Sequence, residues 1–301
     1  MTEGNPLRVQ SAPFGLVCCV IVMAIIEISC SSSSQPRSTS ADSQQPSEMP
    51  MAKAQVKNLV VAIPRHVTYK RFTFDGIGGP VTIDDISLDQ DALETHVIDV
   101  LGFDNKSTYK SYAIGEVVRI LHPIIAINAG ASSGDPALPA ALGLVVDNNK
   151  VVTALNPKQS LATGVFCIDQ TGRARIFHVG AYRQGTCREA VQSGPVVIEP
   201  HGVVGILQRE DTHPRLARFL TALDRSGKLH FLATTPAHLY DLAQLMVRPV
   251  KNGGMDCTDA LNLATGDRES ALYFFDGLNK AHVFGNLDAP VPTVIVVQNR
   301  V

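Results

Sequence analysis

The stretch FLTALDRSGKLHFLA, residues 219–233, consists of two short apolar runs around the turn sequence DRSG. Apolar runs of this length around a turn that contains Gly are typical of a β-hairpin. The pattern recurs: residues 165–169 and 174–179 surround a Thr-Gly turn, and residues 196–199 and 203–207 surround a Pro-His-Gly turn. Because hairpins join antiparallel strands, the sequence predicts a sheet with mostly antiparallel neighbours.

Two other segments have helical spacing. In residues 108–121 apolar side chains recur every three or four positions, and Pro123 ends the segment. In residues 236–247, Pro236 suits a first helical turn and Thr235 can cap it. Many strands, few helices and hairpin connections predict the α+β class, a single domain with a large mixed or antiparallel sheet and a few flanking helices. Further strands are expected at residues 59–63, 67–74, 81–88, 96–100, 124–128, 143–146, 150–155, 260–263, 271–275 and 292–297.

The N-terminal part of the chain has the pattern of an export signal. Residues 14–26 form an apolar run of 13. A spanning helix needs about 20 apolar residues, so this run fits a signal peptide better. The run leads to Ser29-Cys30, which resembles the site where bacterial lipoproteins are lipidated, and in residues 31–50 Ser, Gln and Pro fill 14 of 20 positions. The sequence therefore predicts a signal peptide of the lipoprotein type (residues 1–29), a disordered linker (30–54) and a domain (55–301).

Two alternatives to the lipoprotein are an ordinary cleaved signal peptide and a short uncleaved anchor, and both also export the domain. We expect a protein of the bacterial cell envelope, in the outer membrane or periplasm, held to the membrane by a lipid on Cys30. In the domain, Cys167, Cys187 and Cys257 remain. One pair could form a disulfide in an oxidising compartment, but the sequence does not decide which; buried free thiols are the alternative.

Composition and short motifs exclude several classes of function. With 26 Lys+Arg and 28 Asp+Glu, the net charge of −2 does not fit a protein that binds nucleic acid through a basic surface. The chain has no Walker motif, no dinucleotide-binding glycine motif and no HxH or HExxH spacing. From the sequence pattern we expect no cofactor and no metal site in this protein. Whether its activity needs a divalent cation stays open.

Polar residues follow or precede predicted strands in several places. Asn128 and Gly130 follow the apolar run IIAI, and the sequence QSGP at residues 192–195 forms a predicted donor-rich loop before an apolar strand. Arg218 precedes another strand and could bind a phosphate. Carboxylates follow residues 260–263 and could act as general acid or base. Each of these is also common in ordinary turns and solvated loops.

Taken in chain order, these segments resemble the phosphodiester glycosidase family, whose members remove a sugar from a phosphodiester. The matching segments are IAINAG followed by PAALGLVVDNNK, GVF with Asp169, AVQSGP, the segment from Arg218 to Gly227, and DLAQLM followed by DALNLATGDRES. The resemblance covers roughly residues 57–301. It implies an exported hydrolase that cleaves the sugar–phosphate bond of a sugar phosphodiester from cell-envelope or exopolysaccharide glycans.

The resemblance also implies roles for individual residues. An Arg can neutralise the single negative charge of a phosphodiester, and a carboxylate can serve acid–base chemistry at the sugar. By this match Arg218 and Asn262 are catalytic residues, and the substrate-binding residues are Asn128, Gly130, Gln192, Ser193 and Gly194. Asp267, from the loop that follows the last motif, is the third predicted catalytic residue.

One departure from the family pattern affects the expected activity. The family sequence L-D-G-G corresponds here to LATG, residues 263–266, so Ala264 replaces the carboxylate. Asp267 or Glu269 could supply a carboxylate from the longer loop that follows. The alternative is a non-catalytic glycan-binding lipoprotein on the same fold. A third hypothesis, a purely structural envelope protein, predicts that the motif residues do not converge in space.

Overall fold

The computed structural model describes residues 65–102, 113–133, 139–207, 215–277 and 280–300. These residues belong to one compact unit, Pro50–Val301. The predicted signal peptide, the lipidation site Cys30, the linker and the strand expected at residues 59–63 lie outside the described residues.

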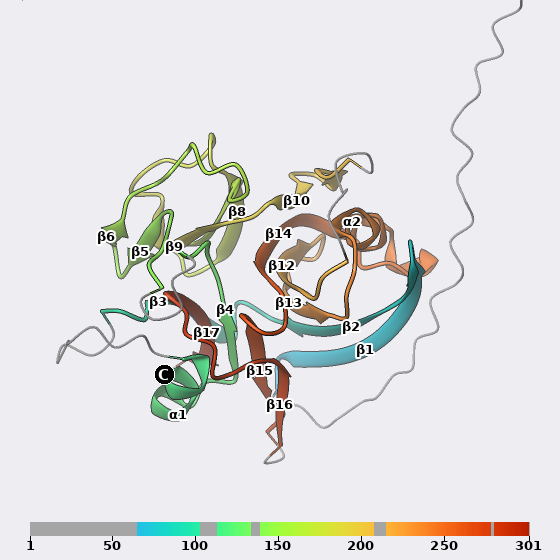
Figure 1. Ribbon diagram of the computed structural model, residues 1–301, viewed down its shortest axis with the longest axis horizontal. Helices are drawn as coiled ribbons and strands as arrows, with labels where there is room; N and C mark the ends of the chain where they lie inside the picture. The colour runs from blue at the N-terminus through green and yellow to red at the C-terminus, as the bar shows by residue number, and fades with distance from the viewer. Residues whose placement is uncertain (1–64, 103–112, 134–138, 208–214, 278–279, 301) are drawn as a thin grey trace, which may run out of the picture. The chain divides into compact units, whose positions relative to one another are not determined.

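Antiparallel sheets dominate the described part of the chain (Figure 1), which confirms the predicted α+β class. The seven-stranded sheet has the spatial order β1 (Val67–Gly76), β2 (Gly79–Leu88), β13 (Leu229–Thr234), β12 (Arg218–Asp224), β14 (Cys257–Thr265), β10 (Val196–Glu199) and β11 (Val203–Val204). A five-stranded sheet has the order β16 (Ala281–Gly285), β15 (Ala271–Phe275), β4 (Ile125–Asn128), β17 (Thr293–Asn299) and β3 (Leu93–Asp99). A second five-stranded sheet has the order β6 (Lys150–Thr153), β5 (Val145–Asp147), β9 (Cys187–Ser193), β7 (Gly164–Asp169) and β8 (Ala174–His178).

The predicted hairpins are confirmed. β12 pairs with β13, β7 with β8, and β10 with β11, all antiparallel and around the predicted turns. The run at residues 124–128 forms β4, the middle strand of its sheet, and is buried throughout. A strand with both faces covered needs apolar residues at every position, which explains why this run does not alternate.

Two strand predictions were wrong or incomplete. The residues expected to form a loop before Pro195 are the end of β9, which is buried at six of its seven positions although it contains Glu189, Gln192 and Ser193. The polar residues made this segment look like a loop in the sequence. Their burial is possible because they form hydrogen bonds with segments distant in the sequence. β16 was not predicted, and its alternation of exposed and half-buried residues is typical of an edge strand.

The described residues also form two α-helices and a short 3₁₀ helix, η1 (Val250–Asn252). α1 (Ile114–Leu121) lies within the predicted helix, whose residues 108–112 are outside the described part. α2 (Leu239–Val247) begins later than predicted, and Thr235 does not cap it. The Thr235 hydroxyl instead accepts a hydrogen bond from the Thr82 backbone at 2.9 Å, so it extends the pairing of β13 with β2. Neither α-helix in the described ranges is long and apolar enough to cross a membrane.

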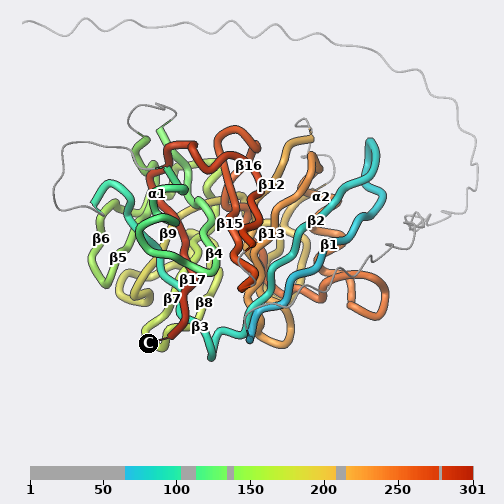
Figure 2. Tube along the Cα trace, turned by 90° about the horizontal axis from the view of Figure 1, so that it is seen from below, coloured from blue at the N-terminus to red at the C-terminus, as the bar shows by residue number. Residues whose placement is uncertain are grey.

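One hydrophobic core is shared by the sheets. It includes Phe166 from β7, Ile127 from β4 and Phe219 from β12, all essentially inaccessible. In both views, β4, β15 and β17 lie between the sheet of β5 to β9 and the seven-stranded sheet (Figures 1 and 2). α2 covers the other face of the seven-stranded sheet, and α1 packs beside β4 and β17.

Candidate functional site

A cavity of about 190 Å³ lies where the ends of three strands meet. β4 contributes Asn128, β9 contributes Ser193, and β14 contributes Asn262 and Thr265. Each strand belongs to a different sheet, so the cavity exists only when all three sheets are assembled. A single water needs roughly 10–15 Å³ of such space, so the cavity can admit a group much larger than water.

Most of the residues predicted to form a site are brought together here. Gln192 and Arg218 lie directly behind the lining, each hydrogen-bonded to a lining residue, so the motif residues converge. This argues against the purely structural hypothesis, which predicted no convergence. Asp267 is exposed and is not among the lining residues. The predicted residues that line the cavity are Asn128, Gly130, Ser193, Gly194 and Asn262.

Asn262 connects β14 to the segment that directly follows β9 at the cavity. Its side-chain Nδ2 donates to the Gly194 carbonyl at 2.9 Å and to the Thr265 hydroxyl at 3.2 Å. A carbonyl can only accept, so this contact fixes which end of the amide faces Gly194. Asn262 is 3 % exposed, and its Oδ1 has no hydrogen-bond partner among the described residues. A buried carbonyl oxygen without a donor costs roughly 1–3 kcal/mol, which marks this position as unusual in a native fold.

Two glycines allow the backbone to pack closely around the cavity. An ideal Cβ on Gly194 would lie 2.4 Å from the Leu161 carbonyl oxygen and 2.6 Å from the Thr163 nitrogen. Gly130 has a φ of +91°, a conformation that side chains disfavour, and its Cβ would lie 3.0 Å from Val191. These positions require glycine for a steric reason, independently of any ligand.

Gln192 has a positioning role. It is 1 % exposed, and all its amide hydrogen bonds go to backbone. Its Oε1 accepts from Leu144 at 3.1 Å and from Asn156 at 2.9 Å, while its Nε2 donates to Asn156 at 2.7 Å and to Ala162 at 2.8 Å. The amide is therefore saturated, and Gln192 holds the segment from residue 144 to 162 against the end of β9.

Ser193 also fixes backbone. Its hydroxyl donates to the carbonyls of Asn262, at 3.0 Å, and Leu263, at 2.8 Å, which joins β9 to β14. A serine nucleophile needs a neighbouring base to take its proton, and here the proton is directed at backbone carbonyls. This geometry agrees with the predicted hydrogen-bonding role and gives no support for a nucleophile.

Arg218 approaches the cavity through Thr265. It is 5 % exposed, at the start of β12 and opposite Thr265 in the sheet. Its NH1 donates to the Thr265 hydroxyl at 3.1 Å. The guanidinium thus places a positive charge one side chain behind the cavity wall.

The carboxylate of the lining is Glu269. Ala264 lines the cavity at the position where the family pattern has its acid, and Glu269 comes from the loop that follows β14. The sequence analysis predicted Asp267 as the catalytic carboxylate, with Glu269 as the alternative, and of these two residues only Glu269 lines the cavity. Thr265 and Ser270 also line it, and neither was predicted as a site residue. For Thr265 a signal was present in the sequence, since it stands three residues after Asn262 where the pattern of the resembled family has a glycine.

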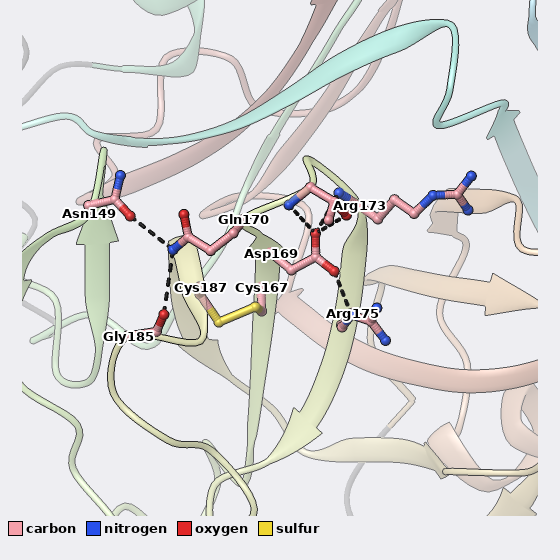
Figure 3. Close-up of a disulfide and its surroundings, with 9 residues drawn as sticks. Asn149, Cys167, Asp169, Gln170, Arg173, Arg175, Gly185 and Cys187 are labelled. Carbon is pink, nitrogen blue, oxygen red and sulfur yellow. Dashed lines mark hydrogen bonds and ion pairs between the residues drawn. A yellow bond between two sulfur atoms is a disulfide. The ribbon is translucent and has the colours of Figure 1, made fainter.

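A disulfide supports the sheet that carries Ser193. Cys167 in β7 and Cys187 in β9 are joined, with a Cα–Cα distance of 5.5 Å (Figure 3). Cys257 is free and buried, and burial together with nearby carboxylates raises its pKa well above the ordinary value. This identifies the pair that the sequence left open.

Beside the disulfide, Asp169 organises the turn between β7 and β8 (Figure 3). Its Oδ1 accepts from the Thr171 hydroxyl at 2.5 Å and from the Arg173 backbone at 3.1 Å, and its Oδ2 accepts from Arg175 at 2.7 Å. Burial alone would raise the pKa of Asp169, but these hydrogen bonds lower it to about 2. The Asp of the GVF motif is therefore a structural residue of the turn. No group of three or more His, Cys, Asp and Glu suited to a metal ion occurs in the described ranges.

No family model and no curated protein sequence matches this chain. Among solved structures, the chain is similar to the catalytic domain of zebrafish N-acetylglucosamine-1-phosphodiester α-N-acetylglucosaminidase, auto-inhibited by its pro-peptide. The TM-score is 0.54 at 13% identity, over 83% of this chain and 89% of the other. A protein of Synechocystis described as hypothetical is similar with a TM-score of 0.50 at 14% identity, over 78% of this chain and 62% of the other. At these identities the likeness establishes a shared fold.

Proposed function

We propose that this protein is an exported hydrolase that cleaves the sugar–phosphate bond of a sugar phosphodiester. One observation carries the proposal: five residues from three separate sequence motifs, in or next to strands of three sheets, line one polar cavity. The shared fold with a catalytic domain that bears this activity in its name supports it. Export is supported by the Cys167–Cys187 disulfide, since disulfides persist mainly in oxidising compartments.

In the proposed reaction, Glu269 is the acid–base residue. Hydrolysis of a glycosidic bond needs a carboxyl group close to the bond that breaks. Ala264 cannot supply it, and Glu269 is the one carboxylate among the described residues of the lining. Asn128 and Asn262 would bind sugar hydroxyls, and Arg218 would favour the phosphate through its charge.

Phosphorus NMR of the purified protein with a panel of sugar-1-phosphodiesters tests the proposal. We expect a new phosphomonoester signal, which Glu269→Gln weakens by about 10²-fold or more, the usual contribution of a general acid or base. Asp267→Asn is the matched control, because it removes a carboxylate two residues away that does not line the cavity. Equal loss in both variants, or none in either, would contradict the role of Glu269.

A second function, a non-catalytic glycan-binding lipoprotein anchored at Cys30, is favoured by Ala264 in the cavity wall. It predicts ligand-induced chemical shifts without turnover of any sugar phosphodiester. Turnover by the wild-type protein would remove this alternative. In neither function is a cofactor or a nucleic-acid partner proposed.

A further inference from the structure

The hydroxyl of Thr265 has an unusual set of neighbours. Arg218 NH1 donates to Thr265 Oγ1 at 3.1 Å, and Asn262 Nδ2 donates to the same atom at 3.2 Å. A hydroxyl oxygen has two acceptor lone pairs and one hydrogen. Two donors therefore occupy both lone pairs, and the hydrogen must point away from both of them.

No acceptor for this hydrogen is found among the residues that the structure describes. The hydroxyl's two hydrogen bonds are the ones it accepts. Thr265 is half-buried and its side chain belongs to the wall of the cavity. A buried or half-buried hydroxyl normally uses its proton, so the cavity is the place where an acceptor for it would be bound.

The charge of Arg218 makes this hydroxyl a stronger donor. Hydrogen bonds in a chain polarise one another, and a charged donor at the start of the chain strengthens the next bond. The guanidinium is 5 % exposed, so solvent screens it little. Its positive charge also offsets the negative charge of Glu269, the one ionisable residue that the described part of the lining contains. A Thr265 hydroxyl polarised by a cation therefore binds a negatively charged acceptor more strongly than a neutral one.

We propose that Thr265 binds a phosphoryl oxygen of the ligand and that Arg218 acts on the phosphate through this hydroxyl. Thr265 is then a ligand-binding residue, and Arg218 a positioning residue that orients and polarises it. The inference rests on the proposed function for the nature of the ligand, a phosphodiester. It accounts for why the arginine of the motif stands behind the cavity wall.

Titration of the purified protein with inorganic phosphate, followed by phosphorus NMR, tests the proposal. Thr265→Val keeps the shape and strand preference of threonine and removes the hydroxyl, while Thr265→Ser keeps the hydroxyl. We expect the valine variant to bind phosphate at least about tenfold more weakly, the loss typical of a hydrogen bond to a charged group. The serine variant should bind within about twofold of the wild-type protein.

A double-mutant cycle measures the coupling between Arg218 and Thr265 in phosphate binding, which a merely structural role of either residue would not produce. Arg218→Lys keeps a charge but cannot hold the same hydrogen bond, so its effect on phosphate binding should largely vanish in the Thr265→Val background. Additive effects would overturn the coupling. Thermal unfolding of each variant shows whether weaker phosphate binding comes from loss of the fold. As a second control, a neutral methyl glycoside should bind the Thr265→Val variant as tightly as it binds the wild-type protein.

The outcomes separate this inference from the proposed function. Equal phosphate affinity in the wild-type and Thr265→Val proteins, or no phosphate binding by the folded wild-type protein, overturns the role of Thr265. Turnover of sugar phosphodiesters by the same wild-type protein would leave the hydrolase proposal standing. Phosphate binding that depends on Thr265, without turnover of the panel, would keep the inference and remove the hydrolase.

Discussion

Asn262 Nδ2 donates to the carbonyl of Gly194 at 2.9 Å, and this bond joins the end of β9 to the end of β14 at the cavity. The two residues are 68 positions apart in the sequence: Asn262 lies in β14 of the seven-stranded sheet, and Gly194 directly follows β9, a strand of another sheet. A side chain of the candidate site is thus also part of what holds the sheets together. Variants of these residues must be tested for stability as well as for activity.

Replacing Gly194 with alanine should destabilise the protein. The new Cβ would lie 2.4 Å from a backbone oxygen and 2.6 Å from a backbone nitrogen, and backbone cannot give way cheaply. Overpacking of this kind costs about 1–3 kcal/mol of the free energy of unfolding. Urea unfolding measures it. Gly180→Ala is the control, because its nearest neighbour would be 3.9 Å from the Cβ, and it should change stability by less than about 0.5 kcal/mol.

Reducing the Cys167–Cys187 disulfide should destabilise the protein by about 3 kcal/mol, as expected for a bridge between residues separated by 20 positions. The thermal midpoint of the wild-type protein should fall when a reductant is added. The double variant Cys167→Ala, Cys187→Ala should have a low midpoint that the reductant does not change. Cys257→Ala should stay sensitive to the reductant, because Cys257 is free; insensitivity of this variant would contradict the pairing.

The buried His230 should make stability fall in mildly alkaline solution. Its Nδ1 lies 2.8 Å from Asp85, and its Nε2 lies 3.5 Å from Asp224, an ion-pair distance. Burial alone would lower the pKa of His230, but the two carboxylates outweigh it and raise the pKa from 6.5 to about 9. A group whose pKa is higher in the folded than in the unfolded state stabilises the folded protein. This stabilisation is complete at pH values below the unfolded-state pKa and is lost as pH rises through about 9.

Urea unfolding between pH 6.5 and about 9 should therefore show a loss of stability on the order of 2–3 kcal/mol. The His230→Gln variant should be less stable at pH 6.5 and should lack this dependence. Burial raises the pKa of the Cys257 thiol well above its ordinary value, so this thiol ionises only in the unfolded state and adds a smaller loss of stability close to pH 9. His178→Gln, at an exposed position, should keep the wild-type curve. A wild-type curve that stays flat over this range would refute the charged state of His230.

Asp169→Asn should destabilise the protein at neutral pH by about 2 kcal/mol, because the carboxylate accepts bonds from Thr171, Arg173 and Arg175. The pKa of Asp169 is lowered to about 2, so its contribution is present above pH 3.8 and is lost as pH falls through about 2. The difference between wild-type and variant should shrink over that range in acid unfolding. Asp91→Asn is the control: Asp91 is 70% exposed in its pair with Arg173, and exposed pairs contribute about 0–1 kcal/mol.

The sequence predicted well those features that depend on neighbouring residues. The hairpin around Asp224 to Gly227 follows from two apolar runs and a turn, and the buried strand that ends at Asn128 follows from its uninterrupted apolar residues. The order of the motifs also identified the lining residues Asn128, Gly130, Ser193, Gly194 and Asn262. Local propensity and hydrophobic pattern are encoded over a few residues, so one sequence suffices to read them.

Contacts between distant segments decided the rest. Only the assembled sheets place Glu269 at the cavity and leave Asp267 outside it, although both follow the same strand. Gln192 was predicted to bind the ligand. Its amide is instead fully hydrogen-bonded to backbone 30 to 48 positions away, so Gln192 supports the cavity wall. Pairing of Cys167 with Cys187 likewise depends on β7 and β9 being neighbours. The sequence by itself determined most of the strands and the polar residues that follow several of them. The tertiary structure decided which side chains meet, because burial and hydrogen bonding are shared among segments from three sheets.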